Sequence, residues 1–406
     1  MTYYSIPLVV PHLAGNEKKY INECLDSKQI SHDGTFIKDF EDEFAAYTGA
    51  NFAISVSNGT AALHLALLAA GVKPGEGVFA PVVTFIAPIN AISYVRARPV
   101  FVDVDSDSMG ISPESVQSFI DKFCYFKDGT LINRFSNEKI TALVAVHTYG
   151  HSPRIDELSE ITQKYNLALI EDASVAVGTR YKDKHVGTFG QFGCFSFTGN
   201  KLLATGNGGM ITTNDEKLAD KIKHLKNHAI TDSYYFYHDE VGYNYKMTNI
   251  AAALGLAQME YITQTISSKR KVHFLYEQAF KELEHIELLT ELDWCRSNYW
   301  MAILKVADSK KDDFVSFMKD NSIESRPLWE LNNRHPMYSA CSCANIDNSI
   351  ALYDSIVAIP CHQSMTDTQI QFVIDKVTEF DRTAFPAEQD DSETVNENEK
   401  IEVVGA

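Results

Sequence analysis

Two residues of the sequence, a lysine and an aspartate, carry the strongest signs of chemistry. Lys201 stands in a small, glycine-containing turn after the apolar run 195–197. A lysine becomes a useful nucleophile when its ammonium group is partly desolvated, because desolvation lowers its pKa. Asp172 follows the apolar run 168–170, and open α/β sheets place their ligands at such strand ends. Taken singly, Lys201 is more simply a solvated surface lysine, and Asp172 a helix cap.

The pairing of these two residues changes that balance. Asp172 and Lys201 are 29 residues apart, each at the end of a predicted strand of one sheet. An aspartate that keeps a pyridine nitrogen protonated and a lysine that forms a Schiff base are the minimal apparatus of pyridoxal phosphate chemistry. The pair therefore predicts pyridoxal 5'-phosphate as the cofactor.

Residues nearer the N-terminus could hold the phosphate and the ring of such a cofactor. The segment 57–60 separates a predicted strand from its helix, and exposed N–H groups at a helix N-terminus form a natural phosphate site. Gly59 would let the phosphate approach closely, although simple capping by Asn58 or Thr60 is the alternative. Phe85 follows another predicted strand and could stack on a flat ring, or it could be an ordinary core residue.

The elements that must position these residues follow from the hydrophobic pattern. Between residues 51 and 261, short apolar runs alternate with segments of helical periodicity, which predicts an α/β fold with a mostly parallel, helix-covered sheet. We expect a large domain over 1–262 with an N-terminal helical arm, a small α+β domain over 263–380, and an acidic, disordered tail over 381–406. The expected strands are 52–56, 78–80, 99–102, 142–146, 167–170 and 301–305, and the expected helices are 60–68, 113–123, 155–165, 263–283, 311–320 and 368–380.

Composition and charge exclude several classes of partner. The chain has 406 residues, with 54 acidic against 36 basic side chains and a formal charge of −18. So acidic a chain offers no general basic face to a nucleic-acid polymer or an anionic membrane. No apolar run reaches the roughly 18 residues that span a bilayer, and the N-terminus does not read as a signal peptide.

The cysteines and glycines predict neither a metal site nor a nicotinamide site. Seven cysteines, an odd number, favour reduced thiols and a cytoplasmic protein. The close pair Cys341 and Cys343 lacks the spacing of a zinc site. No G-x-G-x-x-G motif follows a predicted strand, which disfavours a nicotinamide enzyme.

Together the motifs resemble those of a known family. Along nearly the whole chain to about residue 380, the sequence resembles the fold-type I, pyridoxal-phosphate-dependent sugar aminotransferases of the DegT/DnrJ/EryC1/StrS family. The segments that carry the resemblance are 57–63, 171–173, 194–201, 208–210 and 242–249.

The resemblance implies a role for each candidate residue. Lys201 would hold the cofactor covalently and then move a proton between the substrate carbon and the cofactor. Asp172 would pair with the pyridinium nitrogen, and Phe85 would cover the ring. The phosphate would be bound by Gly59, Thr60 and Ser196.

Two further positions bear on the site. In this family Asn244 would reach the phosphate of the neighbouring subunit, so an active homodimer with shared active sites is implied. Val175 stands where the family usually carries His, Gln or Glu, and a valine cannot hydrogen-bond the ring oxygen of the cofactor or a substrate group. This departure could slow the reaction or adapt the site to a different sugar.

The resemblance also suggests the substrates. The turn 199–201 resembles that of enzymes which aminate C-4 of nucleotide-linked 4-keto-6-deoxy sugars for surface polysaccharides, with L-glutamate as amino donor. Segments 297–300 and 325–329 are most similar to transaminases of bacillosamine and legionaminic acid pathways, so a UDP-linked 2-acetamido-4-keto-2,6-dideoxyhexose is the main expectation. Segment 336–338 is shared with perosamine synthases, so GDP-4-keto-6-deoxymannose is the alternative. Arg326 and Trp329 would contact the substrates.

Two other functions on the same scaffold are possible. A pyridoxal-phosphate-dependent sugar 3-dehydratase would replace the lysine with histidine, so Lys201 argues against it. A catalytically silent regulatory homologue is disfavoured by the intact Asp172 and Lys201, whereas Val175 keeps it open.

Overall fold

A nine-stranded sheet forms the centre of the larger part of the molecule. The computed structural model describes residues 4–307 and 310–385. The strand order is β1-β11-β10-β7-β6-β2-β3, with the β4–β5 hairpin added beside β6. The neighbours from β10 to β3 are parallel, and β11 runs antiparallel to both β1 and β10, which confirms the mostly parallel sheet. The strand bounds are β1 (Phe52–Val56), β2 (Gly77–Pro81), β3 (Arg98–Val102), β4 (Cys124–Lys127), β5 (Thr130–Asn133), β6 (Lys139–Val146), β7 (Ala168–Asp172), β10 (Phe192–Ser196) and β11 (Gly209–Thr213).

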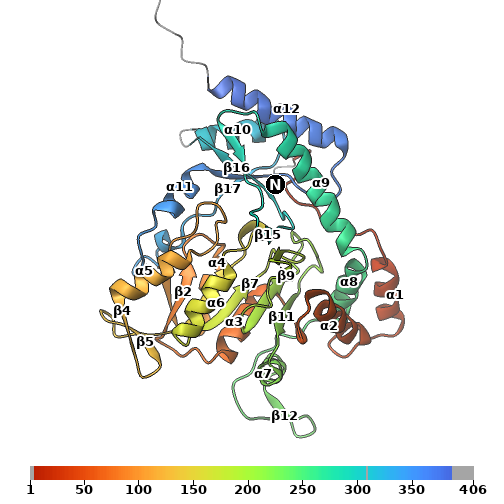
Figure 1. Cartoon of the computed structure of the whole chain (residues 1–406). Helices are drawn as coiled ribbons and strands as arrows, with labels where there is room; N and C mark the ends of the chain where they lie inside the picture. Colours follow the sequence, from red (N-terminus) through yellow and green to blue (C-terminus); the bar gives the residue numbers. More distant parts are fainter. Residues whose placement is uncertain (1–3, 308–309, 386–406) are drawn as a thin grey trace, which may run out of the picture.

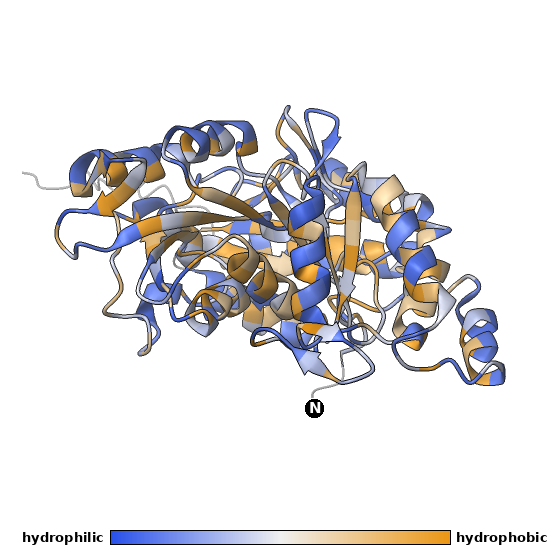
Figure 2. Ribbon diagram, turned by 90° about the horizontal axis from the view of Figure 1, so that it is seen from below, coloured by the Kyte–Doolittle hydropathy of each residue, from blue (hydrophilic) through white to orange (hydrophobic). Residues whose placement is uncertain are grey.

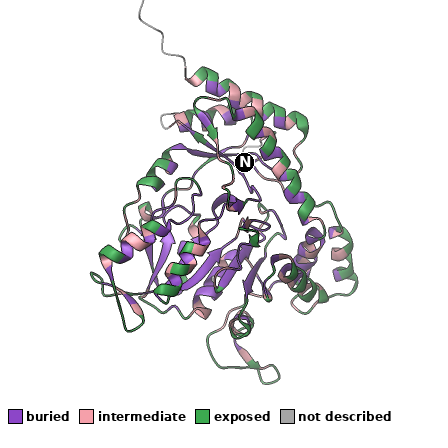
Figure 3. Cartoon of the chain, viewed as in Figure 1, coloured by how far each residue is buried: buried purple, intermediate pink, exposed green. Residues whose placement is uncertain are grey.

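Helices cover both faces of this sheet because successive strand residues point to opposite sides. In β2, Val78 and Ala80 belong to one apolar cluster and Phe79 to another. The first cluster contains residues of α3, α4 and α7, and the second contains residues of α2, α5, α6 and α8. The buried strands lie beneath helices whose outer sides are exposed (Figure 3). The helix bounds are α2 (Thr35–Thr48), α3 (Gly59–Ala69), α4 (Ile86–Tyr94), α5 (Pro113–Phe123), α6 (Ile155–Lys164), α7 (Glu216–Lys226) and α8 (Asn249–Met259).

A smaller antiparallel sheet forms a second layer with its own core. Its strand order is β14-β16-β18-β17. Tyr276, Phe314 and Phe380, from three helices, pack together with strand residues in a separate apolar cluster. Figure 1 shows α10 and α12 at the outer side of this sheet, and α9 running from it toward the large sheet. The bounds are α9 (Ile262–Phe280), β14 (Ile286–Leu288), β16 (Ala302–Val306), α10 (Lys311–Asp320), β17 (Arg326–Pro327), α11 (Asp347–Ser355), β18 (Ile356–Ile359) and α12 (Asp367–Ala384).

The structure differs from the expected domain limits at the C-terminal end of the small domain. The break between α8 and α9 falls at 260–261, but whether 262 separates two domains stays a prediction. Helix α12 continues to Ala384, so its last turn occupies the start of the segment expected to be a tail. Amphipathic periodicity explains this extension, since Val377 and Phe380 are buried one turn before the helix end. The expected acidic tail from 386 onward lies outside the described residues.

Short elements complete the chain. Helix α1 (Glu17–Asp26) packs with α2 against α8, and the strands β8 (Arg180–Tyr181), β9 (Lys184–His185) and β15 (Cys295–Arg296) form a three-stranded ribbon. The hairpin of β12 (Ile230–Asp232) and β13 (Tyr237–His238) projects from the molecule beyond α7 (Figure 1). Figure 2 shows that the sheet strands are largely hydrophobic and that the helices around them carry both hydrophobic and hydrophilic residues. Among the described helices, none combines the length and apolarity needed to cross a bilayer.

Candidate active site

A cavity of about 760 Å³ opens where the carboxyl ends of the large sheet's strands meet the second sheet. Its walls come from the turns after β1 and β2, from the ends of β6, β7 and β10, and from β17 and the turn before β16. Eight of the nine residues that were predicted to be catalytic or to bind the cofactor or substrates line this cavity. They are Gly59, Thr60, Phe85, Asp172, Ser196, Lys201, Arg326 and Trp329.

Asp172 is the last residue of β7 and is buried at the cavity floor. Its Oδ1 accepts a hydrogen bond of 3.1 Å from the backbone N–H of Ser174. Burial raises the pKa of the Asp172 carboxyl, whereas Ser174 and the charge of Lys201 oppose the rise. A desolvated carboxylate of this kind is stabilised by a cationic N–H partner, as a protonated pyridine ring offers.

Lys201 lies across the cavity in the turn after β10. Burial lowers the pKa of its ammonium group to about 8, against an opposing effect from the Asp172 charge. Its Nζ lies 4.5 Å from the centroid of the Trp300 ring, and Trp300 Nε1 donates a hydrogen bond of 2.9 Å to the Asn200 carbonyl. Lys201 is therefore not a fully solvated surface lysine, because it is partly buried beside the Trp300 ring.

The N-terminus of α3 forms a small cradle. Asn58 caps the helix by accepting a hydrogen bond of 2.8 Å from the Ala61 N–H, so the capping alternative is correct for this residue. Gly59 begins the helix, and a Cβ at this position would lie 2.6 Å from Ser196 Cβ and 3.2 Å from Ser174 Oγ. A helix N-terminus that is open at a glycine and bordered by hydroxyls fits a phosphate group.

Aromatic rings line the outer part of the cavity. Phe85 is 56% exposed, so it is not the buried core residue that was the alternative. Its ring centroid lies 6.4 Å from that of Trp329, which in turn stacks on Tyr149 at 4.7 Å with an interplanar angle of 12°. Tyr149 has φ 54°, a left-handed conformation that costs a non-glycine residue about 1–3 kcal/mol. The surrounding packing therefore holds this ring in place.

The second sheet brings Arg326 and Trp329 to the mouth of the cavity. The Arg326 side chain is 64% exposed and pairs with Glu324 at 2.9 Å. The segment that follows is anchored by the buried Asn332, whose Nδ2 donates to the carbonyls of Val82 (3.1 Å) and Thr84 (2.7 Å). This anchor fixes the segment after Trp329 beside the turn that carries Phe85.

Asn244 is the one predicted site residue that does not line this cavity. It is exposed, and its backbone forms an isolated bridge with Asn227 at the base of the β12–β13 hairpin. In the same region, His224, Asp239 and Glu240 present ligand-type atoms within 4.8 Å of one another. None of these three lines the cavity, and Lys221 forms an ion pair with Glu240.

Sequence reasoning missed several residues that shape the site. Glu171 is fully buried and accepts hydrogen bonds from His147 (3.0 Å) and from the N–H groups of Gly187, Phe189 and Gly190 (2.7–2.8 Å). These bonds tie the end of β7 to the loop before β10. The acidic pair in the 171–173 motif was the only local sign of this role.

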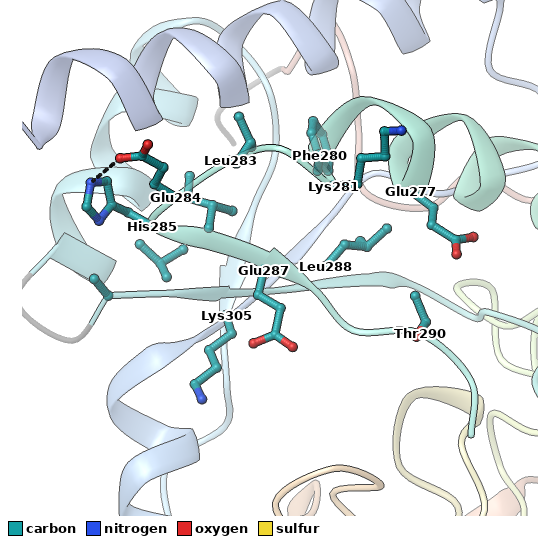
Figure 4. A pocket seen from close by; sticks show the side chains of 13 residues that line it. Glu277, Phe280, Lys281, Leu283, Glu284, His285, Glu287, Leu288, Thr290 and Lys305 are labelled. Carbon is teal, nitrogen blue, oxygen red and sulfur yellow. Dashed lines mark ion pairs between the residues drawn. The ribbon is translucent and has the colours of Figure 1, made fainter. Parts of the chain in front are cut away.

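A second hollow, of about 450 Å³, lies at the end of α9 beside β14 and β16 (Figure 4). It is bordered by charged side chains, including the ion pair of Glu284 with His285. No residue that the sequence singled out lines it. The strand-end cavity is therefore the candidate active site.

The fold and the cavity fit a pyridoxal-phosphate-dependent aminotransferase, and comparison with known proteins shows this class. The model of the DegT/DnrJ/EryC1/StrS aminotransferase family matches residues 11–378. The chain belongs to this family. The expected family, cofactor and enzyme class are thereby confirmed, and the chain is a sugar aminotransferase.

Individual relatives extend over almost the whole chain. The chain is 37% identical over 377 residues to the GDP-perosamine synthase of Escherichia coli O157:H7, covering 92% of this chain and 98% of that protein. It is 33% identical to the putative pyridoxal phosphate-dependent aminotransferase EpsN of Bacillus subtilis, covering 91% and 94%. Among solved structures, the aminotransferase from Psychrobacter cryohalolentis aligns with a TM-score of 0.82 at 25% identity, covering 91% of this chain and 97% of that one.

Proposed function

We propose that this protein transfers an amino group from L-glutamate to C-4 of a nucleotide-linked 4-keto-6-deoxy sugar. The observation that carries the proposal is Lys201, whose pKa is lowered to about 8 in a cavity that also contains a buried carboxylate. An amine with such a pKa can both accept and donate a proton near neutral pH. Bound pyridoxal phosphate would supply the electron sink for the reaction.

The chain's own residues would divide the work of binding and proton transfer. Asp172 would hold the ring nitrogen protonated, and Phe85 would cover the ring with its exposed face. The N-terminus of α3 would bind the phosphate through Gly59, Thr60 and the hydroxyl of Ser196. Lys201 would move the proton at the carbon that gains or loses nitrogen, in both halves of a ping-pong cycle.

The relatives favour a GDP-linked sugar over the UDP-linked sugar that was the main expectation. GDP-perosamine synthases of three organisms are 34–37% identical to the chain. The UDP-4-amino-4,6-dideoxy-N-acetyl-beta-L-altrosamine transaminase of Campylobacter jejuni is 29% identical over 86% of the chain. We therefore place GDP-4-keto-6-deoxymannose first and the UDP-linked 2-acetamido sugar second. Arg326 and Trp329 stand where either substrate would enter.

A panel assay tests the substrate. Purified holoenzyme and L-glutamate are offered GDP-, UDP- and dTDP-linked 4-keto-6-deoxy sugars, and release of 2-oxoglutarate is measured. Release with the GDP-linked sugar is expected to be fastest. Preference for the UDP-linked sugar would restore the second candidate, and release with none of them would contradict the proposal.

The lysine variant tests the catalytic role. Lys201→Ala is expected to lose the visible absorbance of the attached cofactor and at least about 10³-fold in rate, because it removes both the covalent link and the proton carrier. Lys217→Ala, at an exposed position of α7, is the matched control and should keep both. An unchanged spectrum in Lys201→Ala would place the attachment elsewhere.

A further inference from the structure

One buried hydroxyl in the cavity has no partner within the described part of the chain. Thr148 is 1% exposed and lines the cavity with Asp172, Val175 and Lys201, yet its Oγ1 makes no hydrogen bond to any described residue. Buried hydroxyls are nearly always paired, because an unpaired one loses its hydration without replacement. Because Thr148 belongs to the cavity wall, an atom of a bound ligand is a candidate partner for this hydroxyl.

The sheet register places Thr148 beside Asp172. Val146 at the end of β6 pairs with Asp172 at the end of β7, and the His147 N–H donates to the Asp172 carbonyl at 3.0 Å. Thr148 therefore lies just beyond the carboxyl end of β6, the strand that pairs with β7 and Asp172. Ser196, which borders the glycine cradle, ends β10 on the opposite side of β7.

The strand order also orients the cofactor ring. In pyridoxal phosphate the ring nitrogen and the carbon that carries the reactive group are para to each other, and the phosphate arm and the ring oxygen lie on opposite sides of that axis. With the nitrogen at Asp172 and the phosphate toward β10 and α3, the ring oxygen of a bound cofactor would face β6. Thr148 stands on that side.

At the β7 turn, the hydroxyl of Ser174 borders the glycine cradle, whereas Val175 offers no polar group to the cavity. Its side chain is apolar, and its backbone carbonyl accepts a hydrogen bond of 2.9 Å from Asn298 Nδ2, which fixes the turn. We propose that the hydroxyl of Thr148 donates a hydrogen bond to the ring oxygen of bound pyridoxal phosphate, a contact that Val175 cannot make. Thr148 is then a cofactor-binding residue, and the valine is tolerated because of it.

Three variants test this assignment. Thr148→Val keeps the shape and removes the hydroxyl, whereas Thr148→Ser keeps the hydroxyl. Apo-protein is titrated with pyridoxal phosphate, and binding is followed by the visible absorbance and by quenching of tryptophan fluorescence. We expect Thr148→Val to bind about tenfold more weakly and to shift the pH at which the absorbance band changes, with Thr148→Ser close to the wild type. Adding Val175→Gln to Thr148→Val should restore most of the affinity.

A structural role for the hydroxyl would give a different result. Since Oγ1 has no partner in the described protein, removing it should leave the melting temperature of the apo-protein unchanged or raise it. A lower melting temperature of apo Thr148→Val with unchanged affinity for the cofactor would overturn the proposal. So would wild-type affinity and an unshifted pH profile in that variant. Neither outcome depends on which sugar is the substrate.

Discussion

The lowered pKa of Lys201 determines the pH at which the apo-protein presents a free amine to its cofactor. Burial lowers the pKa of this lysine from 10.5 to about 8, so its unprotonated fraction grows as the pH rises through 8. Attachment of pyridoxal phosphate requires the free amine. We expect the attachment rate of the apo-protein to rise with pH and level off above about pH 9, as measured by stopped-flow absorbance. A rate still rising tenfold per pH unit at pH 10 would contradict the lowered pKa.

The same shift has a consequence for the stability of the apo-protein. Between about 8 and 10.5 the unfolded chain keeps the proton on residue 201 that the folded chain has lost. The unfolded state therefore binds more protons, and this group makes the free energy of unfolding increase with pH across that window. Denaturant titrations of apo wild type and Lys201→Met should differ in their pH dependence there.

At the level of single residues, the sequence predicts the groups that follow strands and misses those that reach the site through packing. Asp172 and Lys201 are recognisable because strand ends of one parallel sheet converge at one edge. Tyr149 and Trp300 stack or contact across elements that are far apart in the chain, and periodicity carries no information about such contacts. Asn244 does not line the cavity of its own chain.

At the scale of elements, the cradle at the start of α3 requires that residue 59 has no Cβ atom. Alanine normally favours a helix over glycine, but Gly59→Ala would place Cβ 2.6 Å from Ser196 Cβ. We expect Gly59→Ala to destabilise the protein by about 1–3 kcal/mol and to weaken cofactor binding more than tenfold, because Ser196 must move. Gly199→Ala, where nothing lies within 4 Å of the new Cβ, is the control for the stability measurement.

The end of β7 depends on the buried carboxylate of Glu171. Although burial opposes its ionisation, the hydrogen bonds from His147 and from the Gly187 and Gly190 N–H groups lower the pKa of Glu171. Because folding lowers this pKa, Glu171 stabilises the fold at pH values above its pKa in the unfolded chain. The stabilisation is lost as the pH falls through its pKa in the folded chain. Glu171→Gln is expected to lower the free energy of unfolding at pH 7 by about 3 kcal/mol, since an amide cannot accept all four bonds. The exposed Glu160→Gln should change it little.

Clear periodicity predicted several helices and strands, but α7, whose buried residues also recur with a helical period, was missed, as were short or atypical elements. The expected helix 113–123 coincides with α5, where Ser112 caps the N-terminus and Pro113 begins the helix. The β4–β5 hairpin and α4 were missed. Helix α4 is only nine residues long and contains Pro88, and β4 is mostly exposed, so neither shows a continuous apolar pattern.

For the whole molecule, the projecting hairpin supports the implied homodimer. Tyr234, Tyr235 and Phe236 are 73–81% exposed, an unusual group of aromatic rings for a free surface. The hairpin leads directly to Asn244, the residue expected to reach the neighbouring subunit. We expect sedimentation velocity to show a dimer, and a triple change of these aromatics to serine to shift it toward monomer and weaken activity. Phe135→Ser, at a 76% exposed ring elsewhere, should do neither. A wild-type monomer with full activity would exclude the shared site.

The anchoring of the mouth segment by Asn332 has an evolutionary consequence. The groups proposed to hold the cofactor come from the large sheet, whereas Arg326 and Trp329 come from a segment of the second sheet that Asn332 fastens beside Phe85. We expect substitutions between β17 and Asn332 to change the mouth and to leave the strand ends in place, except at Trp329, whose ring stacks on Tyr149. The sugar specificity can therefore change during evolution while amino transfer is conserved. A mouth segment exchanged between relatives, with this asparagine kept, should transfer the sugar preference of the protein it came from.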